Sequence, residues 1–438
     1  MTGFLRLFRR TFSSLGTRNY RLFFVGQTVS IVGTWMQRVA QDWLILELGG
    51  GPIELAIGVG LQSVPSLLLG MYGGVLADRA ELRRLMLWTQ TFFALLSATL
   101  GVLALTNNLN IPLVYVFAFL MGCANVIDKP ARQSFVVQMV GTNDVVNAIS
   151  LNSSINNASR LIGPAIAGVI IGFTNTGVTF LVNSATFFAI IAALVVMDPG
   201  SLTPRLPAPR KRGQVMEGLR YAMADPGIRP VLLSTLIVSN LAQNFRVLLP
   251  LFVVDVLAGG ASGYGLLMSM LGLGALGGAL ACAGMNRPTQ RLVTLQLLGF
   301  GFMSLLAALA PTYVVLAALM IGVGAGSTSF NTTSQSLVLL HAEDDKRGRI
   351  MSLRQMFSNA LTPVGALLIG WVCEVSSPRY GFVVGAGAAL AGAAVVWRPK
   401  GARSDPEISR DRAELASIIG EEQSPGAGPD DVNRGAPR

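Results

Sequence analysis

The chain has 438 residues, of which 52% are hydrophobic and only 13% are charged, and its net charge is +10. Ordinary soluble domains contain roughly 25% charged residues, so this composition excludes a water-soluble fold and indicates a protein that lies in a lipid bilayer. The three cysteines have no C-x-x-C spacing, and they support neither a disulfide framework nor a zinc site.

Apolar segments of membrane-spanning length recur from residue 20 almost to residue 397. A helix of about 20 residues crosses the hydrocarbon layer. In the basic segment 1–19 no small-residue cleavage site follows a short apolar core, so no removable signal peptide is expected. Charges, glycines and prolines divide the apolar part into twelve predicted helices, at residues 20–48, 53–77, 85–106, 111–130, 145–172, 176–197, 228–256, 262–285, 291–310, 312–338, 350–373 and 378–397. We therefore expect an all-α integral membrane protein with twelve transmembrane helices.

The connections between these helices alternate in charge. Lys and Arg gather before the first helix and in every second connection. The remaining connections contain neither residue, near 49–52, 107–110, 173–175, 257–261, 311 and 374–377. Because short cytoplasmic loops are rich in Lys and Arg, both termini are predicted to be cytoplasmic, and only Arg379 opposes this orientation. The positive charge therefore reflects topology, and no nucleic-acid partner is expected.

The two halves of the chain repeat one another. Residues 132–168 align without a gap with residues 334–370 at an offset of 202, and Gly163 and Gly168 match Gly365 and Gly370. The repeat predicts two six-helix bundles related by pseudo-symmetry. The expected organisation is a basic N-terminus (1–19), a first bundle (20–198), a linker (199–227), a second bundle (228–397) and a disordered tail (398–438).

The first predicted helix carries a polar stripe at helical spacing. The stripe consists of Gln27, Ser30, Thr34, Gln37 and Gln41. Arg38 and Asp42 border it and lie four residues apart, close enough to pair. Two such charges cost about 5–7 kcal/mol at the bilayer centre. They therefore indicate a helix that faces a water-filled path, with simple structural pairing as the alternative.

Further polar residues lie on the fifth, seventh and eleventh predicted helices. They are Asn156, Arg160, Asn240, Gln243, Asn244, Arg246, Arg354, Gln355, Ser358 and Asn359. Together with Gln27, Thr34, Gln37 and Gln41 they are predicted to line a substrate cavity. Polar pairing between neighbouring helices is the alternative for each of them.

The connection between the second and third helices reads GGVLADRAELRRLM. It resembles the loop motif G-x-L-a-D-r-x-G-r-k of the major facilitator superfamily, although Glu81 replaces the second glycine of that motif. The matching residues are Gly74, Asp78, Arg79, Arg83 and Arg84. The resemblance implies a cytoplasmic gate in which Asp78 accepts hydrogen bonds from a helix end or from a neighbouring arginine. Topology alone is the alternative explanation for the arginines.

The fourth helix ends in ANVIDKPARQSF, which resembles the exporter branch that contains the enterobactin exporter and macrolide efflux proteins. The resemblance makes Arg132 a candidate partner of Asp78, and Asp128 lies one turn before Arg132. Solvated loop charges are the alternative.

The fifth helix contains ASRLIGPAIAG, which resembles the antiporter motif G-x-x-x-G-P-x-x-G-G. Gly163, Pro164 and Gly168 match the motif, whereas Ser159 and Ala167 replace glycines. Small residues allow close helix approach and the proline bends the helix. Tight packing without any link to antiport is the alternative.

The resemblance implies a proton-coupled exporter of amphipathic small molecules such as siderophores, macrolides or other drugs, in the bacterial cytoplasmic (inner) membrane. Asp42, paired with Arg38, is the predicted proton site. The expected partners are lipid, protons and the small-molecule substrate, and a monomer is expected. No nucleotide motif is present, so the protein is not expected to be an ATP-driven pump by itself. No enzyme activity, cofactor or metal is predicted. A facilitator or importer, and a non-transporting sensor or assembly partner, are the alternatives.

Overall fold

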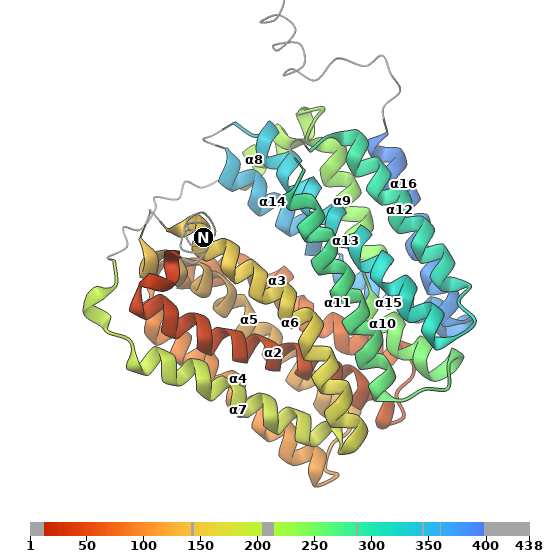
Figure 1. Cartoon of the computed structure of the whole chain (residues 1–438), viewed down its shortest axis with the longest axis horizontal. Helices are drawn as coiled ribbons and strands as arrows, with labels where there is room; N and C mark the ends of the chain where they lie inside the picture. The colour runs from red at the N-terminus through yellow and green to blue at the C-terminus, as the bar shows by residue number, and fades with distance from the viewer. Residues whose placement is uncertain are drawn as a thin grey trace, which may run out of the picture. The chain divides into compact units, whose positions relative to one another are not determined.

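A computed structural model of the chain describes residues 13–141, 144–203, 214–285, 288–343, 346–359 and 361–397. All regular elements within these ranges are helical, as predicted (Figure 1). Residues up to Val396 form one compact unit. The predicted tail and most of the basic N-terminus lie outside the described residues, so their predicted states remain predictions.

Six long helices make up the first half, preceded by a 3-10 turn (η1, Ser13–Gly16). They are α2 (Arg18–Glu47), α3 (Pro52–Arg79), α4 (Leu82–Leu105), α5 (Ile111–Val140), α6 (Val145–Phe173) and α7 (Thr176–Val196). Their order is the predicted one. α3 packs on α5, and α7 packs on α2 and α4.

The second half begins after a 3-10 turn (η2, Pro199–Ser201) and a short helix, α8 (Gln214–Ala224). The helices that follow are α9 (Arg229–Leu241), α10 (Phe245–Leu251), the π-helical turn η3 (Phe252–Val256), α11 (Ala261–Ala283), α12 (Gln290–Ala308), α13 (Tyr313–His341), α14 (Arg347–Asn359), α15 (Thr362–Val375) and α16 (Pro378–Val396). α12 packs on α13 and α16, and α11 packs on α13. α6 with α11, and α3 with α15, are the main contacts between the halves.

Ten segments of the described residues are long and apolar enough to cross a membrane. The two predicted spans missing from this set are α2 and α6, which are 30 and 29 residues long. Both carry polar side chains along their length, which lowers their hydropathy. Twelve spans therefore remain compatible with the structure.

Two of the predicted spans are not continuous helices. The seventh stops at Leu241 and resumes at Phe245, and in the eleventh a turn at Leu361 precedes α15. The breaks contact each other through Asn240, whose amide nitrogen donates to the Phe357 carbonyl oxygen at 2.9 Å. Its Oδ1 accepts from the Leu361 amide at 3.0 Å. Because a break leaves backbone groups without helical partners, such side-chain hydrogen bonds are what make it tolerable in a membrane.

The two broken helices touch closely enough to require a glycine. A Cβ added at Gly365, in α15, would collide with the Asn240 carbonyl oxygen. Gly365 belongs to the internal repeat, and its counterpart Gly163 is equally enclosed, with the Trp35 Cβ 2.5 Å from an added Cβ. The repeated glycines thus mark close backbone approach.

Gly365→Ala is expected to lower the free energy of unfolding by about 1–3 kcal/mol, because the added methyl group forces the crossing apart. Thermal unfolding of the purified protein in detergent measures the effect. Gly387→Ala is the matched control, since nothing lies within 4 Å of a Cβ added there. Equal melting temperatures for the two variants would contradict the close crossing.

Candidate functional site

A buried ion pair joins the two halves. Asp42, on α2, is 1% exposed, and its Oδ1 and Oδ2 accept from Arg246 Nη2 at 2.6 Å and Nε at 2.9 Å. The Tyr264 hydroxyl, on α11, donates to Oδ2 at 2.9 Å. This two-pronged geometry satisfies both carboxylate oxygens, so the negative charge can be kept away from water.

Arg246 also reaches a third helix. Its Nη1 donates to the Gln62 Oε1 of α3 at 2.7 Å. Arg246 lies in the first turn of α10, directly after the break in the seventh span. One guanidinium from the second half therefore holds both α2 and α3 of the first half.

The halves are in close contact at the end of the molecule where α2 terminates, which we call the Glu47 end. An added Cβ on Gly370 of α15 would lie 2.8 Å from the Pro52 carbonyl oxygen at the start of α3. An added Cβ on Gly265 of α11 would lie 2.5 Å from the Pro164 carbonyl oxygen of α6. Asp42 lies one turn inside this end.

The antiporter-like residues form part of this contact. Gly163 faces α2 and Gly168 faces α11, where an added Cβ would lie 3.1 Å from the Gly265 Cα. Ser159 and Ala167, which replace glycines of the motif, are both buried. The structure therefore explains why small residues are needed on α6, while a link to antiport stays a prediction.

The predicted pairing of Arg38 with Asp42 is wrong, because the Asp42 carboxylate binds Arg246 instead. The guanidinium of Arg38 lies over the Trp35 ring, 4.4 Å from its centroid, and Arg160 of α6 approaches the same ring at 5.6 Å. The spacing along α2 correctly indicated that Arg38 and Asp42 are neighbours, but the cation that binds the Asp42 carboxylate comes from another helix.

The contacts of Gln37 favour the alternative of polar pairing between neighbouring helices, and its place in a cavity stays a prediction. Its Oε1 accepts from the Ser97 hydroxyl of α4 at 2.5 Å and from the Asn183 amide of α7. Its Nε2 lies 2.8 Å from the Met121 sulfur of α5. Gln37 thus belongs to a polar cluster inside the first half, and no pattern in the sequence pointed to Ser97 or Asn183 as its partners.

Other residues of the polar stripe on α2 are also buried or hydrogen-bonded within the first half. Gln27 and Gln41 are buried, and the Thr34 hydroxyl donates to the Ser30 carbonyl oxygen of the preceding turn at 2.9 Å. No contact assigns these three to a cavity, so that role stays a prediction.

A second polar cluster lies in the other half. The Gln243 Oε1 accepts from the Asn331 amide of α13 at 3.2 Å, and Arg354 of α14 donates to the Asn331 carbonyl oxygen at 2.8 Å. Asn244 donates to the Asn240 carbonyl oxygen at 2.6 Å and closes the helix break. Asn331 was not among the predicted site residues, although it lies in a polar run of the tenth predicted helix.

Other predicted cavity residues are more open. Asn156, Gln355 and Asn359 are exposed, and Ser358 is half-buried. Asn156 and Asn359 each donate to a carbonyl oxygen of the preceding turn. Their part in a cavity is therefore a prediction that these contacts leave open.

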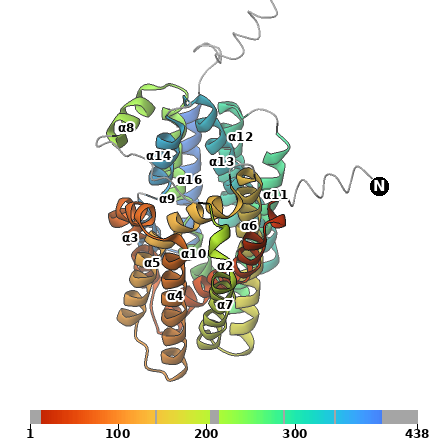
Figure 2. The ribbon, with the colours of Figure 1, turned by 90° about the vertical axis from the view of Figure 1, so that its left-hand side faces the viewer.

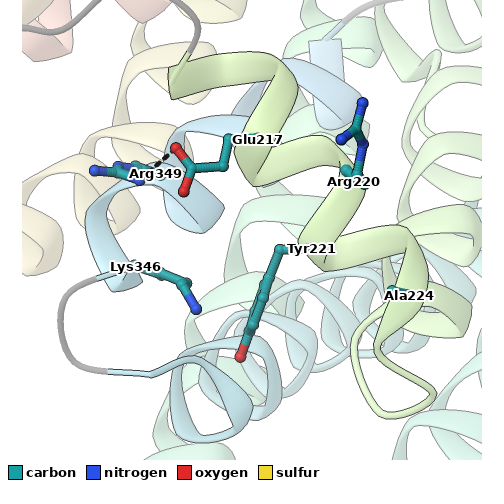
Figure 3. A pocket seen from close by; sticks show the side chains of 6 residues that line it. All are labelled: Glu217, Arg220, Tyr221, Ala224, Lys346 and Arg349. Atoms are coloured by element: carbon teal, nitrogen blue, oxygen red, sulfur yellow. Dashed lines mark hydrogen bonds and ion pairs between the residues drawn. The ribbon is translucent and has the colours of Figure 1, made fainter.

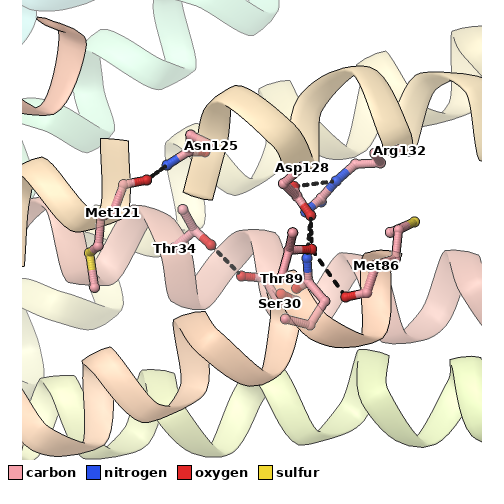
Figure 4. A network of polar contacts seen from close by, with 9 residues as sticks. Ser30, Thr34, Met86, Thr89, Met121, Asn125, Asp128 and Arg132 are labelled. Atoms are coloured by element: carbon pink, nitrogen blue, oxygen red, sulfur yellow. Dashed lines mark hydrogen bonds and ion pairs between the residues drawn. The ribbon is translucent and has the colours of Figure 1, made fainter. Parts of the chain in front are cut away.

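Asp128 anchors a network at the other end of the first half (Figure 4). Its Oδ1 accepts from Thr89 at 3.0 Å and from Gln90 at 2.6 Å, and its Oδ2 accepts from Arg132 Nη2 at 2.5 Å. Asp128 is 2% exposed, so the alternative of a solvated loop charge is wrong for this residue.

The described side chains cover part of the predicted gate. Arg83 donates to the Leu194 carbonyl oxygen at 2.7 Å, and Arg84 pairs with Glu81 at 2.7 Å. Arg79 is exposed at the end of α3. Gly74 and the side chain of Asp78 lie outside the part that the structure describes, so the Asp78 latch stays a prediction.

The short helix α8 lies beside α14 (Figure 2). A pocket of 260 Å³ opens between them (Figure 3), lined by Glu217, Arg220, Tyr221, Ala224, Lys346 and Arg349. Arg349 pairs with Glu217 at 3.2 Å, and Lys346 lies over the Tyr221 ring. A hydrogen bond from Lys346 lowers the pKa of the exposed Glu343 carboxyl. The described part of the linker is thus attached to the second half.

Two helical halves that meet at one end through a buried ion pair, with discontinuous helices at the interface, define a secondary membrane transporter. The chain matches the family of transmembrane secretion effectors of the major facilitator type over residues 9–419, and it belongs to that family. Its members are transporters, not enzymes.

Similar proteins fit this assignment. The staphyloferrin A transporter of Staphylococcus aureus is 25% identical over 81% of this chain and 89% of its own length. The multidrug efflux pump Tap of Mycolicibacterium fortuitum is 26% identical over 78% of this chain and 86% of its own length. Macrolide efflux protein A of Streptococcus pyogenes is 20% identical over 80% of this chain and 89% of its own length. A bacterial homolog of the human lysosomal transporter Spinster has the same fold, with a TM-score of 0.67 and 11% identity, and the match covers 94% of this chain and 98% of that one.

Asp42→Asn and Arg246→Gln are each expected to lower the free energy of unfolding by about 2–5 kcal/mol, because each leaves a buried partner unsatisfied. The double variant is expected to lose less than the sum of the two. Unfolding of the four purified proteins in detergent measures this cycle. Additive losses would mean that the two side chains act independently.

Proposed function

We propose that the chain exports small molecules from the bacterial cytoplasm in exchange for protons. The supporting observation is the Asp42–Arg246 pair, in which a buried carboxylate of one half is held by a cation of the other. Charged residues inside membrane segments mark ion and substrate pathways in transporters. The pair lies where the halves must separate if the Glu47 end opens.

The charge distribution supports an orientation with both termini in the cytoplasm. The connections at the Glu47 end contain no Lys or Arg up to residue 377, whereas those at the other end are basic. In this orientation the Glu47 end faces outward. The close contact there corresponds to a state that is shut toward the outside.

Formation and separation of the Asp42–Arg246 pair would couple proton movement to substrate movement. When the outer end is open, Asp42 is separated from Arg246 and takes a proton from outside. Closing the outer end returns Arg246 to the carboxylate, which favours its charged form and expels the proton inward. Substrate binding from the cytoplasm then drives the opening, so that outward substrate movement and inward proton movement alternate.

The similar proteins support two parts of the proposal, namely that transport runs outward and that the substrate is a small molecule. They are named for a siderophore, for multiple drugs and for macrolides. We extend from them only the general class, a small organic molecule moved out of the cell. A facilitator or importer of the same fold is distinguished by the flux experiment below.

Asp42→Asn is expected to reduce pH-gradient-driven uptake into everted membrane vesicles by about tenfold or more, because its side chain cannot cycle a proton. Uptake is measured with anionic, neutral and cationic fluorescent dyes. Exchange of dye across the membrane without a pH gradient should persist, since alternating access itself remains. Asp255→Asn is the matched control, because Asp255 is an exposed carboxylate at the Glu47 end.

Two results would contradict the proposal. Uptake by the Asp42→Asn protein that still follows the pH gradient would remove Asp42 from proton coupling. Dye movement by the wild-type protein that ignores the gradient would identify a facilitator.

A further inference from the structure

We infer that Arg38, Arg160 and Trp35 form a binding subsite for an anionic group, so that the preferred small-molecule substrate carries a carboxylate or a similar negative charge. The inference rests on the proposed transport function and narrows its substrate class. It concerns a site distinct from the Asp42–Arg246 pair. Its basis is an excess of arginine over carboxylate in the membrane-embedded interface.

The charges at the interface do not balance. Four arginines lie inside the spans that meet there, away from the ends of those spans, namely Arg38, Arg160, Arg246 and Arg354. Asp42 neutralises Arg246. Among the described residues, the other three arginines have no carboxylate within ion-pair distance. Since a charge in a membrane protein normally faces a partner or a wet path, these cations are available to a ligand.

Arg38 and Arg160 converge on one indole ring although they come from different helices. The Arg38 guanidinium is 4.4 Å and the Arg160 guanidinium 5.6 Å from the centroid of Trp35. Cation–π contact orients both groups, but two like charges on one ring repel each other. An anion between or beside them would remove that repulsion and add charge-assisted hydrogen bonds.

An unpartnered donor provides the second observation. The Arg160 Nε at the Trp35 ring is buried and has no hydrogen-bond partner. A buried N–H without an acceptor costs about 1–3 kcal/mol. The Arg160 Nε therefore calls for an acceptor oxygen, which a carboxylate supplies and a cationic group does not.

Binding of two dyes of opposite charge tests the inference. 5-Carboxyfluorescein and rhodamine 123 share a xanthene ring, but the first is an anion and the second a cation. Fluorescence anisotropy with the purified full-length protein gives their dissociation constants without any pH gradient. Wild-type protein is expected to bind carboxyfluorescein more tightly than rhodamine 123.

Arg38→Gln and Arg160→Gln are each expected to weaken carboxyfluorescein binding by about tenfold or more without weakening rhodamine 123 binding. Arg160→Lys should retain part of the affinity, because it keeps the charge but loses the forked donors. Arg379→Gln is the matched control, since Arg379 donates to the Ala308 carbonyl oxygen away from Trp35. Melting temperatures confirm that each variant is folded.

Three results would overturn the inference. They are tighter binding of rhodamine 123, no saturable carboxyfluorescein binding up to about 1 mM, and an unchanged affinity in the folded Arg38→Gln and Arg160→Gln proteins. In nanodiscs, loss of dye binding when phosphatidylglycerol replaces phosphatidylcholine would assign the subsite to a lipid headgroup instead. Arginine-dependent binding without pH-driven transport would retain the subsite and refute the proposed export function.

Discussion

The structure depends on keeping a carboxylate charged inside a hydrocarbon environment. An isolated charge there costs several kcal/mol, and Asp42 avoids most of that cost through the paired donors of Arg246 and the hydroxyl of Tyr264. Because these donors come from the second half, burial of the Asp42 charge holds the two halves together. In the proposed mechanism, separation of the two halves lets Asp42 take up a proton, so the contact that stabilises the closed state also controls its opening.

The broken seventh span makes that contact possible. The interruption after Leu241 begins a new helix at Phe245, which places Arg246 in a first turn that faces α2 and α3. Asn244 donates to the Asn240 carbonyl oxygen at this break, and the Asn240 side chain satisfies backbone groups of the eleventh span. Gly365 allows the seventh and eleventh spans to come into backbone contact. The same local irregularity therefore positions the cation and links two spans of the second half.

Much of this was predictable because it is local. The order of the spans follows from apolar length, and the repeated glycines mark close packing that the structure contains at Gly163 and Gly365. Asp42 could be singled out from the sequence because a carboxylate within a membrane span is costly and indicates a functional or paired residue. The helix breaks were not predicted, because the asparagines that stabilise them act through contacts between spans.

The sequence by itself determined a membrane protein of helical spans with an internal repeat, because composition and helical periodicity act over short distances along the chain. Tertiary structure alone decided which polar side chains meet. Arg38 is four residues from Asp42, yet the carboxylate binds Arg246, 204 residues away. Gln37 faces the inside of one half, whereas Trp35 and Arg160 meet across helices. The rotation and packing of whole helices set these directions, and one helix's sequence does not contain that information.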